Sequence, residues 1–168
     1  TSRFMSPDGA VSMAFRNAVL DLAIDHHFAR RLVNAVRLSL PCSQEASSLT
    51  SADVDLFDVP MRSGMACLDA PVISAAGRDW LLRQLGEGFR LLIIGNAMPQ
   101  ADREFSNDLV VVRVGAGGFA DCEGKVEARY GRGVYLIRPD QHVAARWNDP
   151  GVEQIRAALR QTQKLTPA

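Results

Sequence analysis

The sequence predicts an α/β fold, in which a β-sheet with flanking helices follows an N-terminal helical extension. Three observations lead to this prediction. Residues 89–94 and 109–114 are apolar runs rich in β-branched side chains, which is typical of strands covered on both faces. Residues 134–147 carry alternating apolar positions on either side of Pro139 and Asp140, which indicates a β-hairpin. Apolar residues near the N-terminus recur at helical spacing.

Residues 1–41 are expected to form the helical extension. From residue 10 to about residue 24, spacings of four, three and four positions place on one helical face Val11, Phe15, Ala18 and Leu22. A second helix is predicted from about residue 28 to residue 38, and Pro41 ends it because proline has no amide hydrogen to donate. The apolar stripe needs a cover, which is either the following domain, a second copy of the chain, or another domain of a longer chain.

Residues 42–63 are predicted to be an exposed linker. The segment has few regularly spaced apolar positions, and its short polar residues are Ser43, Ser47, Ser48, Thr50, Ser51, Asp53, Asp55 and Asp58. Such side chains hydrogen-bond the local backbone, so they favour an exposed connection. Residues 64–168 are then the main domain. We expect it to open with an extended stretch over residues 61–71 and a short helix over residues 77–85 that ends at Gly86.

The main domain has the element order of a thioredoxin-like fold. About fourteen residues separate the two apolar runs, which is near the minimum for a parallel crossover, so any helix in residues 99–106 has one or two turns. The hairpin over residues 134–147 adds two antiparallel strands. A final amphipathic helix is predicted from the spacing of Val152, Ile155, Arg156 and Leu159. Strand, crossover, strand, hairpin and helix is the order expected of this fold.

A likeness to a known family rests first on residues 136–147, which read LIRPDQHVAARW. This segment resembles the last hairpin of the C-terminal, thioredoxin-like domain of FAD-dependent aromatic hydroxylases, the phenol hydroxylase and 3-(3-hydroxyphenyl)propionate hydroxylase group. Residues 1–7, 16–20 and 31–41 resemble the helical segment that leaves the flavin domain of these enzymes, and residues 85–95 resemble the opening strand of their C-terminal domain. The resemblance covers most of the chain, in order.

The resemblance implies a parent enzyme that uses FAD, reduced by NADH or NADPH, to transfer one oxygen atom to an aromatic ring. The family's dinucleotide fingerprint and its Gly-Asp-Ala flavin motif do not occur in these 168 residues, so no catalytic or cofactor-binding residue is assigned to the chain. We expect a non-catalytic accessory and interaction domain. Its partners are then the flavin and substrate domains of the same polypeptide, or a second copy in a homodimer. A start at Thr1 in place of methionine adds to the expectation of a fragment.

Two other functions remain open at this stage. The first is a free-standing thioredoxin-like oxidoreductase that uses a single cysteine, either Cys67 or Cys122. Where a redox-active thioredoxin fold places Cys-x-x-Cys, however, the sequence reads Gly-Asn-Ala-Met-Pro over residues 95–99. The three cysteines, including Cys42, are far apart and are typical of buried or incidental thiols. The second alternative is a small-molecule binding module at the carboxyl edge of the sheet.

Other candidate sites are weak. Adjacent His26 and His27 point about 100° apart on a helix, so they are poorly placed to bind one metal ion. The carboxylates of the predicted linker lack the glycine and glutamate of a calcium loop. His142 with Asp140 is more typical of a strand histidine beside a capping turn than of a catalytic pair. Residues 115–118, Gly-Ala-Gly-Gly, lack a third correctly spaced glycine, which favours a flexible loop over a phosphate-binding turn.

Composition limits the partners. Nineteen basic and nineteen acidic side chains give a net charge of zero, so the chain has no net positive field to attract nucleic acid or an anionic membrane. No apolar run approaches the roughly 20 residues needed to cross a bilayer, and the N-terminal residues lack the pattern of a secretion signal. We therefore expect a cytoplasmic protein that binds neither nucleic acid nor a membrane.

Overall fold

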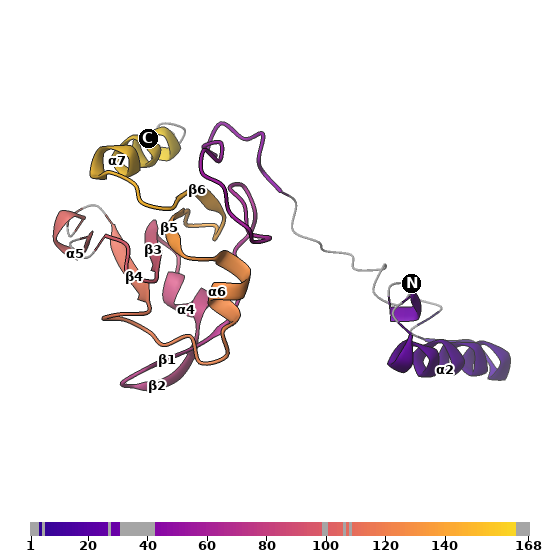
Figure 1. The fold of residues 1–168 in the computed structure, drawn as a ribbon. Coiled ribbons are helices and arrows are strands. Elements are labelled where there is room, and N and C mark those ends of the chain that lie inside the picture. Colours follow the sequence, from indigo (N-terminus) through magenta and orange to yellow (C-terminus); the bar gives the residue numbers. More distant parts are fainter. Residues whose placement is uncertain are drawn as a thin grey trace. The chain divides into compact units, whose positions relative to one another are not determined.

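The computed structural model describes residue 4 and residues 6–26, 28–30, 43–98, 101–105, 107 and 109–163 (Figure 1). The chain divides into two compact units, Thr1–Leu40 and Pro41–Ala168, which are described separately here. The boundary between the two units falls next to the predicted end of the helical extension.

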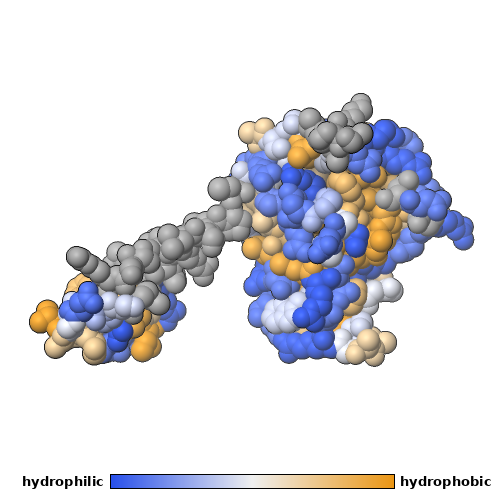
Figure 2. Space-filling view, turned by 180° about the vertical axis from the view of Figure 1, so that it is seen from behind, coloured by the Kyte–Doolittle hydropathy of each residue, from blue (hydrophilic) through white to orange (hydrophobic). Residues whose placement is uncertain are grey.

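Unit 1 contains the predicted N-terminal helix, α2, over Ala10–Asp25. It begins after Gly9, whose φ of 108° favours glycine, and it ends where the amide of His26 donates to the carbonyl of Leu22. No residue of α2 is buried, and the predicted apolar stripe is open: Val11 is 85% exposed and Phe15 is 66% exposed. Figure 2 shows such hydrophobic patches among hydrophilic atoms on this unit. Most of the second predicted helix lies outside the described residues.

Unit 2 is built on a four-stranded mixed sheet, which confirms the predicted α/β fold. The strands are β3 (Arg90–Ile94), β4 (Val110–Val114), β5 (Gly133–Ile137) and β6 (Val143–Trp147). Their order in the sheet is β4-β3-β5-β6, as the ribbon in Figure 1 shows. β3 and β4 run parallel, while β5 is antiparallel to both β3 and β6. Both predicted apolar runs and the predicted hairpin are thus strands of one sheet.

The connection between the two parallel strands has the predicted length. Its helix, α5, is a single turn over Ala101–Glu104. The prediction that both apolar runs are covered on two faces is correct for β3 but wrong for β4. β4 lies at the edge of the sheet, and Val110 at its start is 55% exposed. A run of β-branched residues suits an edge strand as well as a central one, so the sequence alone could not separate the two positions.

Helices cover both faces of the sheet because successive strand residues point to opposite sides. Leu92 and Ile94 pack with α4 (Leu81–Leu85) and α6 (Lys125–Tyr130). Leu91 and Ile93 pack with α5 and α7 (Val152–Gln163). The final amphipathic helix is confirmed: Ile155 and Leu159 are buried against the sheet. The result is three layers, helix, sheet and helix, with an apolar core on each side of the sheet.

The helix predicted for residues 77–85 is wrong in its first half. Residues Gly77–Trp80 form strand β2, which pairs antiparallel with β1 (Pro71–Ser74), and α4 begins only at Leu81. Gly77 has a φ of 116°, a conformation that suits a hairpin turn and not the start of a helix. The predicted stop is correct, because the Gly86 amide donates to Leu82 and ends α4.

Residues 43–63 belong to unit 2 and pack against its sheet, which differs from the exposed linker predicted for this region. Met61 is fully buried in the core, and Thr50 is 8% exposed. Backbone amides of Ser51 and Gly64 donate to the carbonyls of Ala144 and Val143 at 2.8 and 2.7 Å. The segment therefore covers the outer edge of β6, and its polar side chains bind residues that are far away in the sequence.

Candidate functional site

The loop after β3 is the segment where a thioredoxin-like fold would carry a redox-active pair of thiols. It is held by Arg113 of β4, whose guanidinium donates to the carbonyl oxygens of Ala97 at 3.4 Å and Met98 at 2.7 Å. The same guanidinium pairs with the carboxylate of Asp102 at 2.8 Å. The loop has no thiol, but it is fixed in place by side-chain contacts from the neighbouring strand.

A cleft of about 550 Å³ opens beside this loop, at the carboxyl ends of β3 and β4. Its lining contains apolar and glycine positions at the strand ends together with polar side chains from the loop after β3, from α6 and its flanking turns, and from the turn after β6. The lining residues are Ile94, Gly95, Asn96, Ala97, Val114, Gly115, Asp121, Glu127, Arg132, Gly133 and Asn148. The cleft therefore lies at the sheet edge where the sequence allowed a small-molecule site.

The polar groups of the cleft carry a small negative excess. The guanidinium of Arg132 pairs with the carboxylate of Glu127 at 2.9 Å, and both side chains are mostly exposed. Asp121 accepts the Glu127 amide on Oδ2 at 2.9 Å, and its Oδ1 is buried without a partner in the described residues. Among the described residues, the ionisable side chains of the lining are Asp121, Glu127 and Arg132.

Sequence reasoning did not single out these cleft residues. A usable signal was present for two of them, because Asn96 follows the buried strand β3 and Asn148 follows the buried strand β6. Polar residues directly after buried strands often line a site at the sheet edge. The remaining side chains come from α6 and its flanking turns, which the sequence did not predict.

The glycine-rich loop over residues 115–118 serves the packing of the sheet. A Cβ atom at Gly118 would lie 2.3 Å from the carbonyl oxygen of Arg113, so only glycine fits there. The loop continues into isolated bridges, Val114 with Phe119 and Ile73 with Ala120, and no helix starts after it. A phosphate-binding turn draws on the start of a helix, and this loop does not lead directly into one.

Cys67 is unsuited to thiolate chemistry. It is 8% exposed, and its amide donates to the carbonyl of Gln141 at 2.8 Å. Burial, aided by the negative charge of Asp140, raises the pKa of the Cys67 thiol to about 12, against the lowering effect of a hydrogen bond with Tyr130. Cys122 is exposed, and its thiol lies 3.6 Å from the carbonyl oxygen of Pro71. Cys42 lies outside the described residues.

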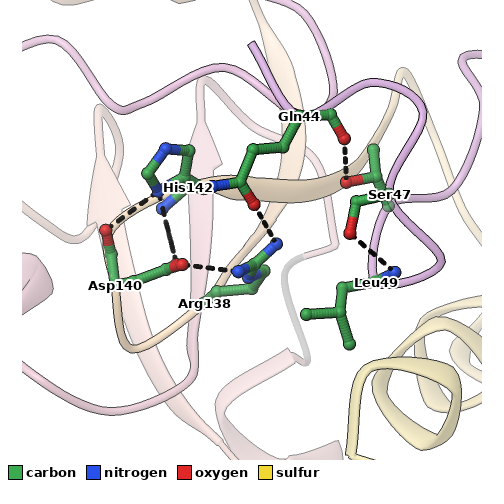
Figure 3. A network of polar contacts seen from close by, with 7 residues as sticks. Gln44, Ser47, Leu49, Arg138, Asp140 and His142 are labelled. Carbon is green, nitrogen blue, oxygen red and sulfur yellow. Dashed lines mark hydrogen bonds and ion pairs between the residues drawn. The ribbon is translucent and has the colours of Figure 1, made fainter. Parts of the chain in front are cut away.

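Polar residues at the hairpin turn hold the segment that precedes the sheet (Figure 3). The guanidinium of Arg138 binds the carboxylate of Asp140 and, at 3.2 Å, the side-chain oxygen of Gln44. Asp140 also accepts the amide of His142 at 3.3 Å, and Nδ1 of His142 lies 3.0 Å from the Asp140 carbonyl oxygen. This is the capping turn that the sequence favoured over a catalytic pair.

Two further hairpin residues make structural contacts. Gln141, with a φ of 58°, donates from its side-chain amide to the carbonyls of Leu82 at 3.1 Å and Gly86 at 3.2 Å, which caps the end of α4. Arg146 is 6% exposed and binds the carboxylate of Asp53 at 2.6 Å. The conspicuous polar residues of the hairpin thus anchor neighbouring segments.

Arg146 is the centre of a buried cluster. Its guanidinium donates to the carbonyl oxygen of Met61 and lies over the ring of Phe57, 4.2 Å from the ring centroid. Asp53, Phe57 and Met61 all belong to the stretch predicted as a linker. One arginine on β6 therefore fixes three points of that stretch to the sheet.

The ion pair between Asp53 and Arg146 predicts that the folded protein loses stability in acid. Burial raises the pKa of Asp53, but hydrogen bonds from Arg146 and Ser63 and the charge of Arg146 outweigh it, so the pKa lies below its usual value. A carboxyl group with a depressed folded-state pKa stabilises the protein above its unfolded pKa of about 3.9, and this contribution is lost as the pH falls through the folded value. Urea unfolding from about pH 6 to pH 2.5 is expected to show a steeper loss below about pH 4 for the wild type than for Asp53→Asn. If the free energy of unfolding fell equally steeply with pH in the two proteins, the ion pair would not stabilise the fold as described.

The other acidic and histidine candidates do not assemble into a site. Asp55 accepts the backbone amide of Asn148 at 2.7 Å, and the ring of His26 lies against Phe28. Within the described part of the chain, no three His, Cys, Asp or Glu residues lie close enough together to hold a metal ion. The same part contains no helix with the length and apolar character needed to span a membrane.

The fold is similar to parts of several solved flavin-enzyme structures. Aklavinone-11 hydroxylase, in a complex with FAD and aklavinone, is similar over 89% of this chain with 20% identity and a TM-score of 0.59. The flavin-dependent monooxygenase PieE is similar over 97% of this chain with 21% identity and a TM-score of 0.54. The rebeccamycin biosynthetic enzyme RebC is similar over 95% of this chain with 22% identity and a TM-score of 0.54.

The chain spans about a third of the length of these proteins: 34% of the first, 31% of the second and 30% of the third. No protein-family model matches the chain, and no curated protein matches it. At these identities the likeness establishes a shared fold.

Proposed function

We propose that this chain is the C-terminal accessory and interaction domain of an FAD-dependent, NAD(P)H-using aromatic-ring monooxygenase of the phenol hydroxylase group. The observation that carries the proposal is the coverage: nearly all of this chain, and about a third of each neighbour, takes part in the match to flavin hydroxylases. The likeness of residues 136–147 to the last hairpin of that group supports the same conclusion. The parent enzyme works in the cytoplasm.

Two structural features support a role without catalysis. The strand order β4-β3-β5-β6 with one parallel pair fits a thioredoxin-like domain, yet the loop after β3 has no thiol. The buried Cys67, with its raised pKa, is a poor substitute. The alternative function, an oxidoreductase that uses a single cysteine, therefore has little support from this residue, and Cys122 would have to supply the thiolate.

The partners in the proposal are the flavin and substrate domains of the same polypeptide. Helix α2 supports this part because it exposes apolar side chains along its whole length, among them Val11, Phe15 and Ile24. A single helix of this length is marginally stable in water unless such side chains are covered. A second copy of the chain is the other cover that the proposal allows.

The purified chain is expected to be colourless and not to oxidise NADH or NADPH. Flavin chemistry is carried by the cofactor, and none of the chain's residues is assigned to hold it. The measurement is the absorbance near the flavin bands after incubation with excess FAD and gel filtration, with a full-length flavin hydroxylase as the positive control. A stoichiometric yellow flavin on the chain would overturn the non-catalytic role.

The parent assignment has a separate test in the gene. The reading frame that contains this chain is expected to encode, before residue 1, two further ordinary domains of about 350–400 residues with a Rossmann-type fingerprint. When these domains are produced separately, they are expected to bind this chain, and Phe15→Ser with Ile24→Ser in α2 is expected to weaken that binding. Arg83→Ala on the surface of unit 2 is the control. A reading frame without a nucleotide-binding portion would refute the assignment.

A further inference from the structure

We infer that the cleft at the carboxyl edge of the sheet binds a small, uncharged molecule that carries hydroxyl groups. This inference concerns the residues of unit 2 alone and does not depend on the proposed function. β3 and β4 run parallel, so both strands end at the same edge, and the loops after them separate there. In α/β folds this edge is the usual place for a ligand.

The size of the cleft suits a small molecule. Its volume of about 550 Å³ lies within the range of roughly 300–1,000 Å³ that is typical of small-molecule sites. Its floor includes the nearly buried side chains of Ile94 and Val114. Beside them lie Gly95 and Gly115, with φ of 90° and 120°.

The backbones of the two strand ends approach each other closely at these glycines. A Cβ atom at Gly115 would stand 3.3 Å from the Cα atom of Gly95, so the two backbones are close to each other. Their φ values are also ones that other residues rarely adopt. The side chain of Arg132 lies over Gly95, with its Cγ atom 3.5 Å from the position that a Cβ atom would take there, so this side chain and the two strand ends together bound the cleft.

The walls offer unused hydrogen-bonding groups. The side-chain amides of Asn96 and Asn148 line the cleft, and within the described part of the chain neither makes a hydrogen bond. A primary amide both donates and accepts, and a hydroxyl group does the same, so hydroxyls on a small molecule match these two side chains. The two amides follow β3 and β6, which have β5 between them in the sheet, so they offer hydrogen bonds from two sides of the cleft.

The charges of the cleft select against anions. Arg132 is the cation of the lining, and it is already paired with Glu127. Among the residues that the structure describes, the carboxylate of Asp121 has no cationic partner, so the lining keeps a negative excess. A ligand with a carboxylate would be repelled, whereas a neutral hydroxylated molecule would not.

The test is a titration of the ¹⁵N-labelled full chain, followed by amide NMR shifts, with two probes that differ in one charge. Catechol is neutral, and 3,4-dihydroxybenzoate adds a carboxylate to the same ring. Catechol is expected to shift the amides of Gly95, Asn96, Gly115 and Gly133 with a dissociation constant on the order of 1 mM, as suits a fragment of eight heavy atoms. The benzoate is expected to bind at least about fivefold more weakly.

Matched variants separate this site from general surface binding. Asn96→Ala combined with Asn148→Ala is expected to weaken catechol binding about tenfold, because two hydrogen bonds are lost. Asn107→Ala, an exposed asparagine outside the cleft, is expected to leave the affinity unchanged. An unchanged amide spectrum outside the cleft shows that the variants are folded.

Three results would overturn the inference: no saturable shifts at the cleft, equal or tighter binding of the benzoate, or full affinity in the folded double variant. Failure here leaves the colourless, non-catalytic chain of the proposed function intact. Conversely, flavin bound to the purified chain would refute the non-catalytic role, while the NMR shifts caused by catechol would still test the cleft.

Discussion

Replacing Arg146 with alanine is expected to lower the free energy of unfolding of unit 2 by about 2–3 kcal/mol. The arginine side chain is 6% exposed, and its removal leaves Asp53 without its cationic partner, Met61 without a donor for its carbonyl, and the Phe57 ring uncovered. The estimate lies below the usual cost of breaking a buried ion pair, because the side chain of Asp53 is 24% exposed and water can reach it. Urea unfolding monitored by circular dichroism measures the change.

Two further variants show whether the loss comes from this cluster. Arg83→Ala removes an exposed i,i+4 pair with Asp79 and is expected to cost less than about 0.5 kcal/mol. Asp53→Ala combined with Arg146→Ala is expected to cost less than the sum of the single changes, because the two residues share one interaction. If Arg146→Ala were as mild as Arg83→Ala, residues 43–63 would not be anchored as described.

Native Cys67 is expected to react with a disulfide reagent at about pH 8 roughly a thousandfold more slowly than an ordinary exposed thiol. The reason is the rise in the pKa of its thiol from the usual 9.0 to about 12 by burial, which lowers the thiolate population by that factor. Cys42→Ser simplifies the measurement to two thiols. Exposed Cys122 then gives the fast phase of 5,5′-dithiobis(2-nitrobenzoate) labelling, and Cys67 gives the slow phase.

The control for this labelling is the denatured protein. In a denaturing concentration of guanidinium chloride both cysteines are expected to react at similar rates, since the difference comes from the folded environment. Cys122→Ser is expected to remove the fast phase and leave the slow one. A native Cys67 that reacted within tenfold of Cys122 would contradict the buried thiol and would restore the oxidoreductase alternative.

The sequence predicted the elements whose signal is local and strong. The two apolar runs, the hairpin turn at Pro139 and Asp140, and the final helix with Ile155 and Leu159 each carry a pattern that few other structures share. The absence of thiols after β3 was also visible directly. These features were sufficient for the fold class.

The missed elements are short or depend on distant partners. α6 has six residues and β1 and β2 have four each, which is too few to establish a period. The composition of residues 43–63 suggests exposure. However, Asp53 binds Arg146, which is 93 positions away in the sequence, and Gln44 binds Arg138, which is 94 positions away. Local composition cannot reveal such partners, and the cleft was missed because it gathers residues from several separate segments.

The covering of β6 bears on how the protein can be shortened. A version cut before residue 64, the predicted domain start, would lose Ser51, which pairs with Ala144 at the rim of the sheet. It would also lose Met61 from the apolar core and leave the guanidinium of Arg146 unpaired. Strands with uncovered rims recruit other polypeptides, so such a version would tend to aggregate on expression. A truncation that starts at residue 43 keeps this protection.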